Sequence, residues 1–175
     1  MIASLVLSAS MFFTYPATYF HQHDVYLGSG YSYAEAQIAV DPTVTGSAYS
    51  DTQSGWLGIQ QATSLVQVGW QRYQGVTREF VQVWGHGGIT VDKWLPYSGS
   101  QTVNVAIAYN EGEWNVYSEG SGTWQKVWQG FAPPSPKTGK WIVATESFDQ
   151  NQPSPLIAGV GQGNGFFTPY IMGSN

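Results

Sequence analysis

The sequence predicts an all-β protein in which two antiparallel sheets pack face to face as a β-sandwich. Apolar and polar residues alternate with a period of two over most of the chain, and Gly- and Pro-rich turn signals recur at short spacing. No stretch keeps the apolar pattern of a helix for long enough to form one. Many short strands with frequent turns are typical of a two-sheet sandwich. A length of 175 residues suits one such domain with a single core.

Period-two alternation marks the strands in chain order. The expected strands cover 33–40, 65–71, 103–109, a segment with Trp114 and Val116, a segment with Trp124 and Trp128, and 141–148. Pro-rich loops at 132–137 and 149–155 flank the last of these strands, because proline cannot join a β-ladder. Loops of this kind often form the walls of a cleft.

The N-terminal segment reads as an appendage to the main domain. We expect residues 1–26 to form an N-terminal strand or extension and residues 27–175 to form the sandwich. The apolar run at Ile2–Leu7 lacks the basic flank and the length of a signal peptide. No segment reaches the roughly 18 apolar residues that a membrane helix needs, so no membrane partner is expected.

Composition narrows the partners and the compartment. The net charge is −5 and no run of Lys or Arg occurs, which argues against a nucleic-acid partner. The absence of cysteine excludes disulfides and thiolate metal sites. Only 10% of residues are charged, so the surface consists largely of Gly, Ser, Thr, Gln, Asn and Tyr. Such surfaces are common in extracellular β-proteins, and we expect a secreted protein; its oligomeric state stays unknown.

One carboxylate lies in an otherwise apolar strand. By alternation, Glu146 shares a face with Ile142, Ala144 and Phe148. A carboxylate on such a face is costly unless it is paired or functional. Two interpretations are open: a functional carboxylate, or a residue at the edge of the strand that reaches water.

Gln67 stands on the polar side of another strand. It shares a face with Leu65, Gly69, Gln71 and Tyr73, opposite a face with Val66, Val68 and Trp70. This places an amide on the side of the strand where a groove would form, and Gly69 leaves space for another backbone. Taken alone, a strand glutamine is usually a solvated residue.

Several short motifs carry a resemblance to two families of glutamic peptidases. The segment 65–71, with Gln67 before Val-Gly-Trp, resembles the neprosin motif with a catalytic Glu before x-Gly-Trp and the eqolisin motif with a catalytic Gln before x-Gly. The segment 54–59 resembles the eqolisin Trp-Val-Gly-Ile strand, and 79–84 is similar to a neprosin strand. The segment 146–148 is similar to the Glu-x-Phe motif of both families.

The resemblance implies a concanavalin-like jelly roll and a glutamic endopeptidase that acts on polypeptides without a cofactor or metal. It implies that Gln67 and Glu146 are catalytic. Ionised Glu146 would take a proton from a water that attacks the scissile carbonyl, and the Gln67 amide would stabilise the oxyanion. Because Glu146 must be ionised at rest and still release protons easily, activity is expected at acidic pH. The expected substrate-binding residues are Trp56, Gln71, Tyr73, Gln82 and Trp84.

Other interpretations remain beside the peptidase. The alternative is a non-catalytic carbohydrate-binding or structural surface module, in which exposed aromatic side chains stack on sugars. The tryptophans expected to be partly exposed are Trp84, Trp94, Trp124 and Trp128, whereas Trp56, Trp70, Trp114 and Trp141 are expected in the core. His21, His23 and Asp24, with His86, could ligate a metal, but a polar loop is the favoured interpretation, so no metal site is expected.

Overall fold

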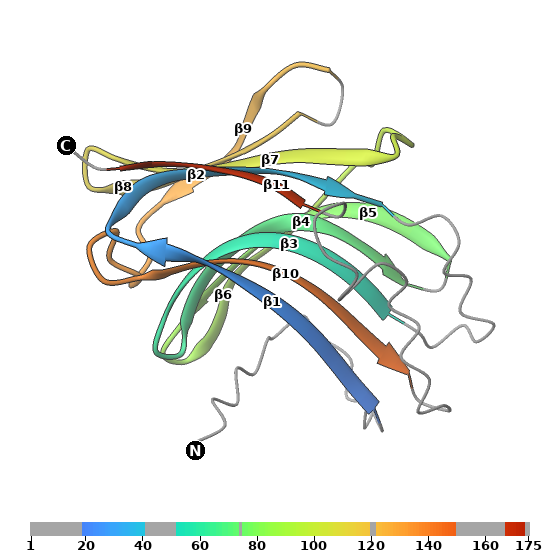
Figure 1. Cartoon of the computed structure of the whole chain (residues 1–175), viewed down its shortest axis with the longest axis horizontal. Helices are drawn as coiled ribbons and strands as arrows, with labels where there is room; N and C mark the ends of the chain where they lie inside the picture. Colours follow the sequence, from blue (N-terminus) through green and yellow to red (C-terminus); the bar gives the residue numbers. More distant parts are fainter. Residues whose placement is uncertain (1–18, 41–51, 74, 120–121, 150–166, 174–175) are drawn as a thin grey trace.

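Two antiparallel sheets form the molecule, as two layers of a sandwich (Figure 1). The computed structural model describes residues 19–40, 52–73, 75–119, 122–149 and 167–173. One sheet has six strands in the order β1 (Tyr19–Ser29), β10 (Lys140–Asp149), β3 (Thr52–Gln61), β4 (Ser64–Tyr73), β5 (Val76–Gly85) and β6 (Gly88–Leu95). The other has five in the order β11 (Phe167–Gly173), β2 (Tyr31–Ala39), β7 (Thr102–Asn110), β8 (Glu113–Ser118) and β9 (Gln125–Gly130).

The predicted two-sheet antiparallel sandwich is confirmed. The strands expected from alternation correspond to β2, β4, β7, β8, β9 and β10, with bounds that differ by a few residues. Strand β6 was not among the strands expected from the sequence, although Ile89, Val91 and Leu95 alternate there with polar or exposed residues. The division of the chain at residue 26 stays a prediction, and β1 runs across it and pairs with β10.

The main core fills the space between the two sheets. It is built from the residues that alternation assigns to the inner faces, among them Ile38, Leu57, Val68, Val81, Val105, Trp114 and Trp141. The rings of Trp114 and Trp141 meet across the two sheets, with centroids 5.8 Å apart at 76°. The indole N–H groups of these two residues both have partners: Trp114 donates to the Pro134 carbonyl and Trp141 to the Tyr31 carbonyl.

A second apolar cluster lies on the opposite, outer face of the six-stranded sheet. It contains Trp56, Leu65, Phe80, Ile142 and Ala144, with Trp84 packed against it. The four tryptophans expected in cores are all buried, and Trp56 belongs to this second cluster. Within the described part of the chain, no helix is long and apolar enough to cross a membrane.

Candidate active site

The outer face of the six-stranded sheet carries both residues that the sequence singled out. Gln67 lies beside Leu65 of the outer cluster, whereas Val66 and Val68 point into the main core. Glu146 follows Ile142 and Ala144 on the same face, as alternation predicts. Gln67 is 0% exposed and Glu146 is 1% exposed. The structure therefore places an amide and a carboxyl group on one face, both withdrawn from bulk water.

The pairing register of β10, β3 and β4 determines where Glu146 and Gln67 lie relative to each other on this face. On β3, Trp56 pairs with Ala144 of β10 and with Gly69 of β4. Glu146 is two residues beyond Ala144, and Gln67 is two residues before Gly69. Because the strands are antiparallel, Glu146, Trp56 and Gln67 lie on one diagonal across β10, β3 and β4, with the indole in the middle.

This diagonal sets the distance that the side chains must span. Each diagonal step in a sheet is about 7–8 Å, so the Cα atoms of Gln67 and Glu146 are on the order of 15 Å apart. A Gln or Glu side chain reaches roughly 5 Å from its Cα. For one water to contact both polar groups, the two side chains must therefore converge above the indole of Trp56.

A chain of hydrogen bonds orients the amide of Gln67. Its Nε2 donates to Oε1 of Gln82 at 2.6 Å, and Nε2 of Gln82 donates to Oδ1 of Asp92 at 3.2 Å. An ionised carboxylate only accepts, so Asp92 selects the orientation of the Gln82 amide and, through it, that of Gln67. Oε1 of Gln67 is buried and has no hydrogen-bond partner among the described residues.

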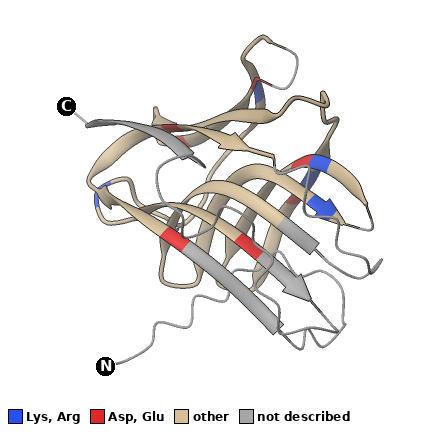
Figure 2. Cartoon of the chain, turned by 45° about the vertical axis from the view of Figure 1, so that its right-hand side comes forward, with Lys and Arg blue, Asp and Glu red and all other residues tan. Residues whose placement is uncertain are grey.

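The carboxyl group of Glu146 is held from β3. The hydroxyl of Ser54 donates to Oε2 of Glu146 at 3.2 Å, and the two residues are directly opposite each other in the ladder. Ser54 is buried and pairs on its other side with Gln71. Charged residues are sparse on the strands of this sheet (Figure 2). The acidic side chains described on β1 and β10 are those of Asp24, which is exposed, and Glu146.

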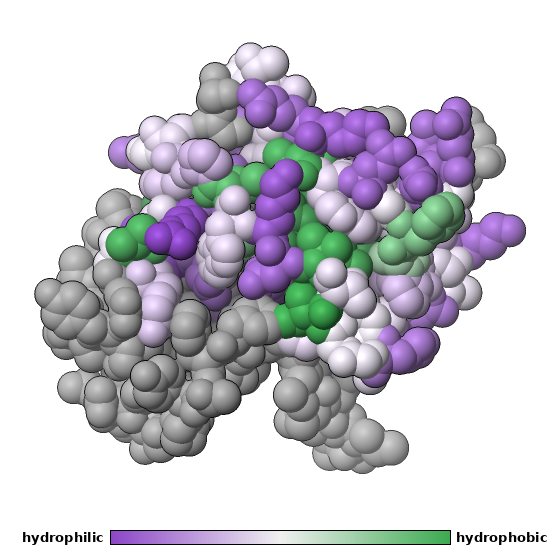
Figure 3. Space-filling view, turned by 180° about the vertical axis from the view of Figure 1, so that it is seen from behind, coloured by the Kyte–Doolittle hydropathy of each residue, from purple (hydrophilic) through white to green (hydrophobic). Residues whose placement is uncertain are grey.

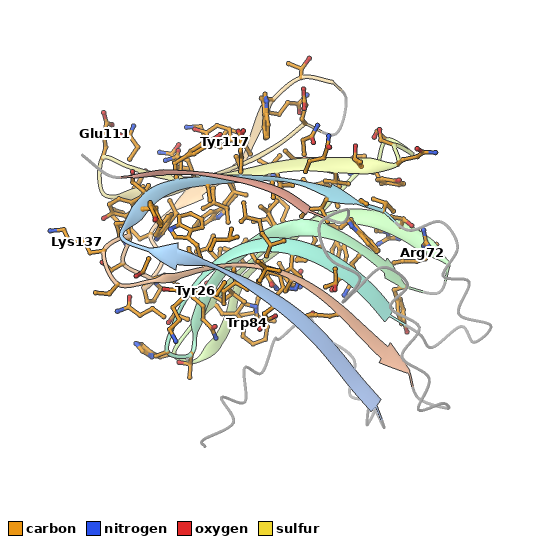
Figure 4. The ribbon with its side chains drawn as sticks, viewed as in Figure 1. Tyr26, Arg72, Trp84, Glu111, Tyr117 and Lys137 are labelled. Atoms are coloured by element: carbon orange, nitrogen blue, oxygen red, sulfur yellow. The ribbon has the colours of Figure 1, made fainter. Side chains whose placement is uncertain are left out.

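The five expected substrate-binding residues lie on the face that carries the pair. Trp56, Gln71 and Gln82 are buried, whereas Tyr73 and Trp84 are half-buried. Figure 4 shows Trp84 on the side of the six-stranded sheet that points away from the five-stranded sheet. A register shift after Val83 pairs Trp84 with Ile89. Their role in substrate binding stays a prediction.

Ser54 and Asp92 contact the pair or its hydrogen-bond chain, and sequence reasoning missed both. Ser54 precedes the Gly-Trp of the eqolisin-like strand, and alternation with Trp56 would have placed it on the outer face. Asp92 alternates with Val91 and Lys93 in β6. Its pairing with Gln82 requires the hairpin register, which the residue types alone do not specify.

The other features predicted from the sequence are a candidate metal site, a loop after Asp149 and four partly exposed tryptophans. Among the residues that the structure describes, no group of three or more His, Asp or Glu side chains gathers as a metal site. The side chains of His21 and His23, and the Pro/Gln-rich loop after Asp149, lie outside the described residues. The tryptophans expected to be partly exposed are so: Trp94 and Trp124 are exposed, and Trp84 and Trp128 are half-buried.

The fold has a likeness among solved structures. Scytalido-glutamic peptidase, crystallised with a peptide-based transition-state analogue, has a TM-score of 0.51 to this chain at 18% identity. The likeness covers 71% of this chain and 63% of that one, so the chain spans less than two thirds of the peptidase's length. At this identity the likeness concerns the fold alone.

Other solved structures have lower scores. SCP-B, a member of the eqolisin family of peptidases in complex with the tripeptide Ala-Ile-His, has a TM-score of 0.38 at 16% identity, covering 71% of this chain and 62% of that one. A toad ovary galectin in complex with thio-digalactose has a TM-score of 0.45 at 11% identity, covering 85% and 98%. No protein-family model and no curated protein matches the chain.

Proposed function

We propose that the protein is a glutamic endopeptidase of the eqolisin type, which hydrolyses peptide bonds with Gln67, Glu146 and a water held between them. The observation that carries this proposal is the diagonal across the outer face of the six-stranded sheet. Two buried polar groups stand at its ends, one on each side of Trp56. The likeness of fold to a glutamic peptidase is consistent with this chemistry.

Glu146 is the general base and then the general acid. Its ionised carboxyl accepts a proton from the water, and the resulting hydroxide attacks the scissile carbonyl carbon. The C–N bond then breaks, and the same carboxyl delivers the proton to the leaving amine. Ser54 donates to Oε2 of Glu146, which orients the carboxyl group that carries the proton.

Gln67 stabilises the oxyanion of the tetrahedral intermediate. Its amide nitrogen has two N–H groups, and one of them is directed to Gln82. The second N–H is the donor for the oxyanion. Because Gln82 is itself anchored to Asp92, the donor is oriented before the substrate arrives, which is the condition for strong electrostatic stabilisation. A glutamine cannot ionise, so the Glu146 carboxyl has no second carboxyl competing for its proton within the pair.

The substrate is a polypeptide in extended conformation. It would cross the outer face over Trp56, with Gln71, Tyr73 and Gln82 contacting its backbone and Trp84 packing against an apolar side chain. We further propose that the enzyme is secreted and works at acidic pH.

Digestion of a denatured protein between about pH 3 and pH 6 tests this function, with the cleavage sites read by mass spectrometry. We expect wild type to cleave and Glu146→Gln to lose at least about 100-fold in rate, since a general base contributes that much or more. Glu111→Gln is the matched control, because Glu111 is exposed in the turn between β7 and β8 and should leave cleavage unchanged. Circular dichroism verifies that each variant is folded.

Equal cleavage by wild type and folded Glu146→Gln would remove Glu146 from the mechanism. If no variant cleaves at any pH, the endopeptidase proposal is wrong. Binding of wild type to a glycan array would then support the carbohydrate-binding module instead.

A further inference from the structure

A second buried carboxyl lies between the two sheets, away from the proposed catalytic pair. Glu79 alternates with Val81 and Val83 on β5, so its side chain points to the inner face, whereas Gln82 of the same strand points to the outer face. Glu79 is 1% exposed. Acidic side chains are almost never buried to this extent unless they are paired. The proposed peptidase mechanism gives Glu79 no part.

The hydrogen bonding of Glu79 is incomplete. The hydroxyl of Ser118, the last residue of β8, donates to its Oε2. Oε1 is buried and has no hydrogen-bond partner in the part of the chain that the structure describes. Burial raises the pKa of Glu79, and the bond from Ser118 opposes this rise. A buried acceptor without a donor is unfavourable, and a bound ligand that supplies the donor would remove this penalty.

Glu79 lines a cavity of about 380 Å³ between the two sheets, which falls in the size range of small-molecule sites. The lining comes from β5, from the end of β6 and the segment after it, and from β8 and β9: Glu79, Leu95, Pro96, Tyr97, Ser98, Ser118, Gln125 and Val127. Both β6 and β9 are edge strands of their sheets. Figure 3, which views the molecule from behind, shows a band of hydrophobic side chains between hydrophilic ones.

Two basic residues lie near this cavity, and each donates a hydrogen bond to an acceptor other than Glu79. Arg72, whose charge acts on Tyr97, donates through Nε to the hydroxyl of Thr77 at 3.0 Å. Lys93 donates to the Val127 carbonyl at 2.8 Å and so links β6 to β9. The charged group that lines the cavity itself is Glu79. The walls are otherwise apolar or neutral, with Leu95 and Val127 among them.

We propose that this cavity binds a small ligand that carries a primary ammonium group on a short apolar body. The ammonium has three N–H donors and would place one of them on Oε1 of Glu79, where charge and hydrogen bonding both favour it. The apolar body would pack against Leu95, Val127 and the ring of Tyr97. The site is separate from the catalytic pair, because β5 presents it on the opposite face of the sheet.

Titration with benzylamine, followed by chemical-shift changes in the protein NMR spectrum, tests this site. Benzyl alcohol, which is similar in size but neutral, is the matched probe. We expect saturable binding of benzylamine to wild type, and binding of benzyl alcohol at least about 10-fold weaker, as removal of a charge-assisted hydrogen bond predicts. Glu79→Gln should weaken benzylamine binding by a similar factor, and Glu111→Gln should not change it. Figure 4 shows Glu111 at the end of the molecule opposite Arg72.

A second variant separates loss of the site from loss of the carboxyl. Ser98 is exposed at the rim of the cavity, so Ser98→Trp should fold and block the cavity while Glu79 stays in place. We expect it to abolish benzylamine binding. The proposal is overturned if benzylamine does not saturate wild type, if benzyl alcohol binds equally well, or if Glu79→Gln or Ser98→Trp binds benzylamine as wild type does. None of these outcomes bears on peptide cleavage, so the two proposals fail independently.

Discussion

At the scale of single residues, Gly69 shows how closely β3 and β4 approach behind the candidate site. A Cβ atom at this position would lie 2.0 Å from the carbonyl oxygen of Gly55 and 2.7 Å from Cα of Trp56. The sequence predicted that Gly69 leaves space for another backbone, and the structure confirms it. The approach seats Trp56 between Gln67 and Glu146, since Gly69 and Trp56 are paired.

Gly69→Ala should destabilise the fold by at least about 2 kcal/mol, because the backbone of β3 at Gly55 and Trp56 must move. The measurement is the free energy of unfolding in urea. Gly87→Ala is the control: a Cβ atom there has nothing within 4 Å, so the change should be within about 0.5 kcal/mol. Similar losses in the two variants would contradict this account of Gly69.

Asp92 should act on catalysis through Gln82. In Asp92→Ala the Gln82 amide loses its anchor, so the Gln67 amide can rotate away from the oxyanion. We expect kcat to fall by about 10- to 100-fold with KM little changed, since misorientation of a catalytic group by a small distance has effects of this size. Steady-state kinetics on a peptide substrate measure the split. A fall in kcat/KM that comes from KM alone would show that Asp92 contributes to binding and not to orientation.

At the scale of strands, alternation predicted the faces of β4 and β10 correctly, and hence the side of the sheet on which Gln67 and Glu146 lie. It did not predict their partners. The contact of Gln82 with Asp92 depends on the register of the β5–β6 hairpin, which shifts after Val83. A shift of this kind reverses the facing of residues beyond it. The same alternation would have placed Glu79 on the inner face with Val81. Because Arg78 and Glu79 are two adjacent charged residues, the sequence did not indicate that one of them is buried.

The buried carboxyl of β5 should make stability depend on pH. Burial raises the pKa of Glu79, so the folded state holds its proton more tightly than the unfolded chain. The resulting stabilisation is fully present below the carboxyl pKa of the unfolded chain and is lost as pH rises through the raised pKa. Glu79→Gln lacks this loss, so its stability relative to wild type should increase as the pH rises from about 4 toward neutral. Urea midpoints measured across this range test it; a constant difference would contradict it.

At the scale of the whole molecule, the order of strands was beyond the reach of the sequence. The pairing of β1 with β10 and of β10 with β3 joins segments far apart in the chain, and period-two alternation reports only the face of each strand. The presence of two sheets was predictable because period-two alternation and turn signals recur along the chain. The contact of Trp114 with Trp141 across the sheets required the three-dimensional arrangement.

Trp114→Phe should reduce the stability of the entire sandwich. The change leaves a cavity beside Trp141 and removes the hydrogen bond to the Pro134 carbonyl, so we expect a loss of about 2 kcal/mol. Trp124→Phe serves as the comparison, since Trp124 is 43% exposed and its loss should be within about 0.5 kcal/mol. Thermal and urea unfolding of both variants give the change in the free energy of unfolding. Equal losses in the two variants would mean that the contact between Trp114 and Trp141 does not stabilise the sandwich.

The hydrogen bond from Lys93 to the Val127 carbonyl also affects edge-to-edge association between copies of this protein. An edge strand exposes backbone groups that can recruit a strand from another copy, and lysines on edges discourage this association. The ammonium group of Lys93 lies between the edge strand β6 of one sheet and the edge strand β9 of the other. A strand that docked along either edge would have to displace this ammonium or bury its charge. The same contact would therefore disfavour the addition of a strand at the β6 edge of one sheet and at the β9 edge of the other.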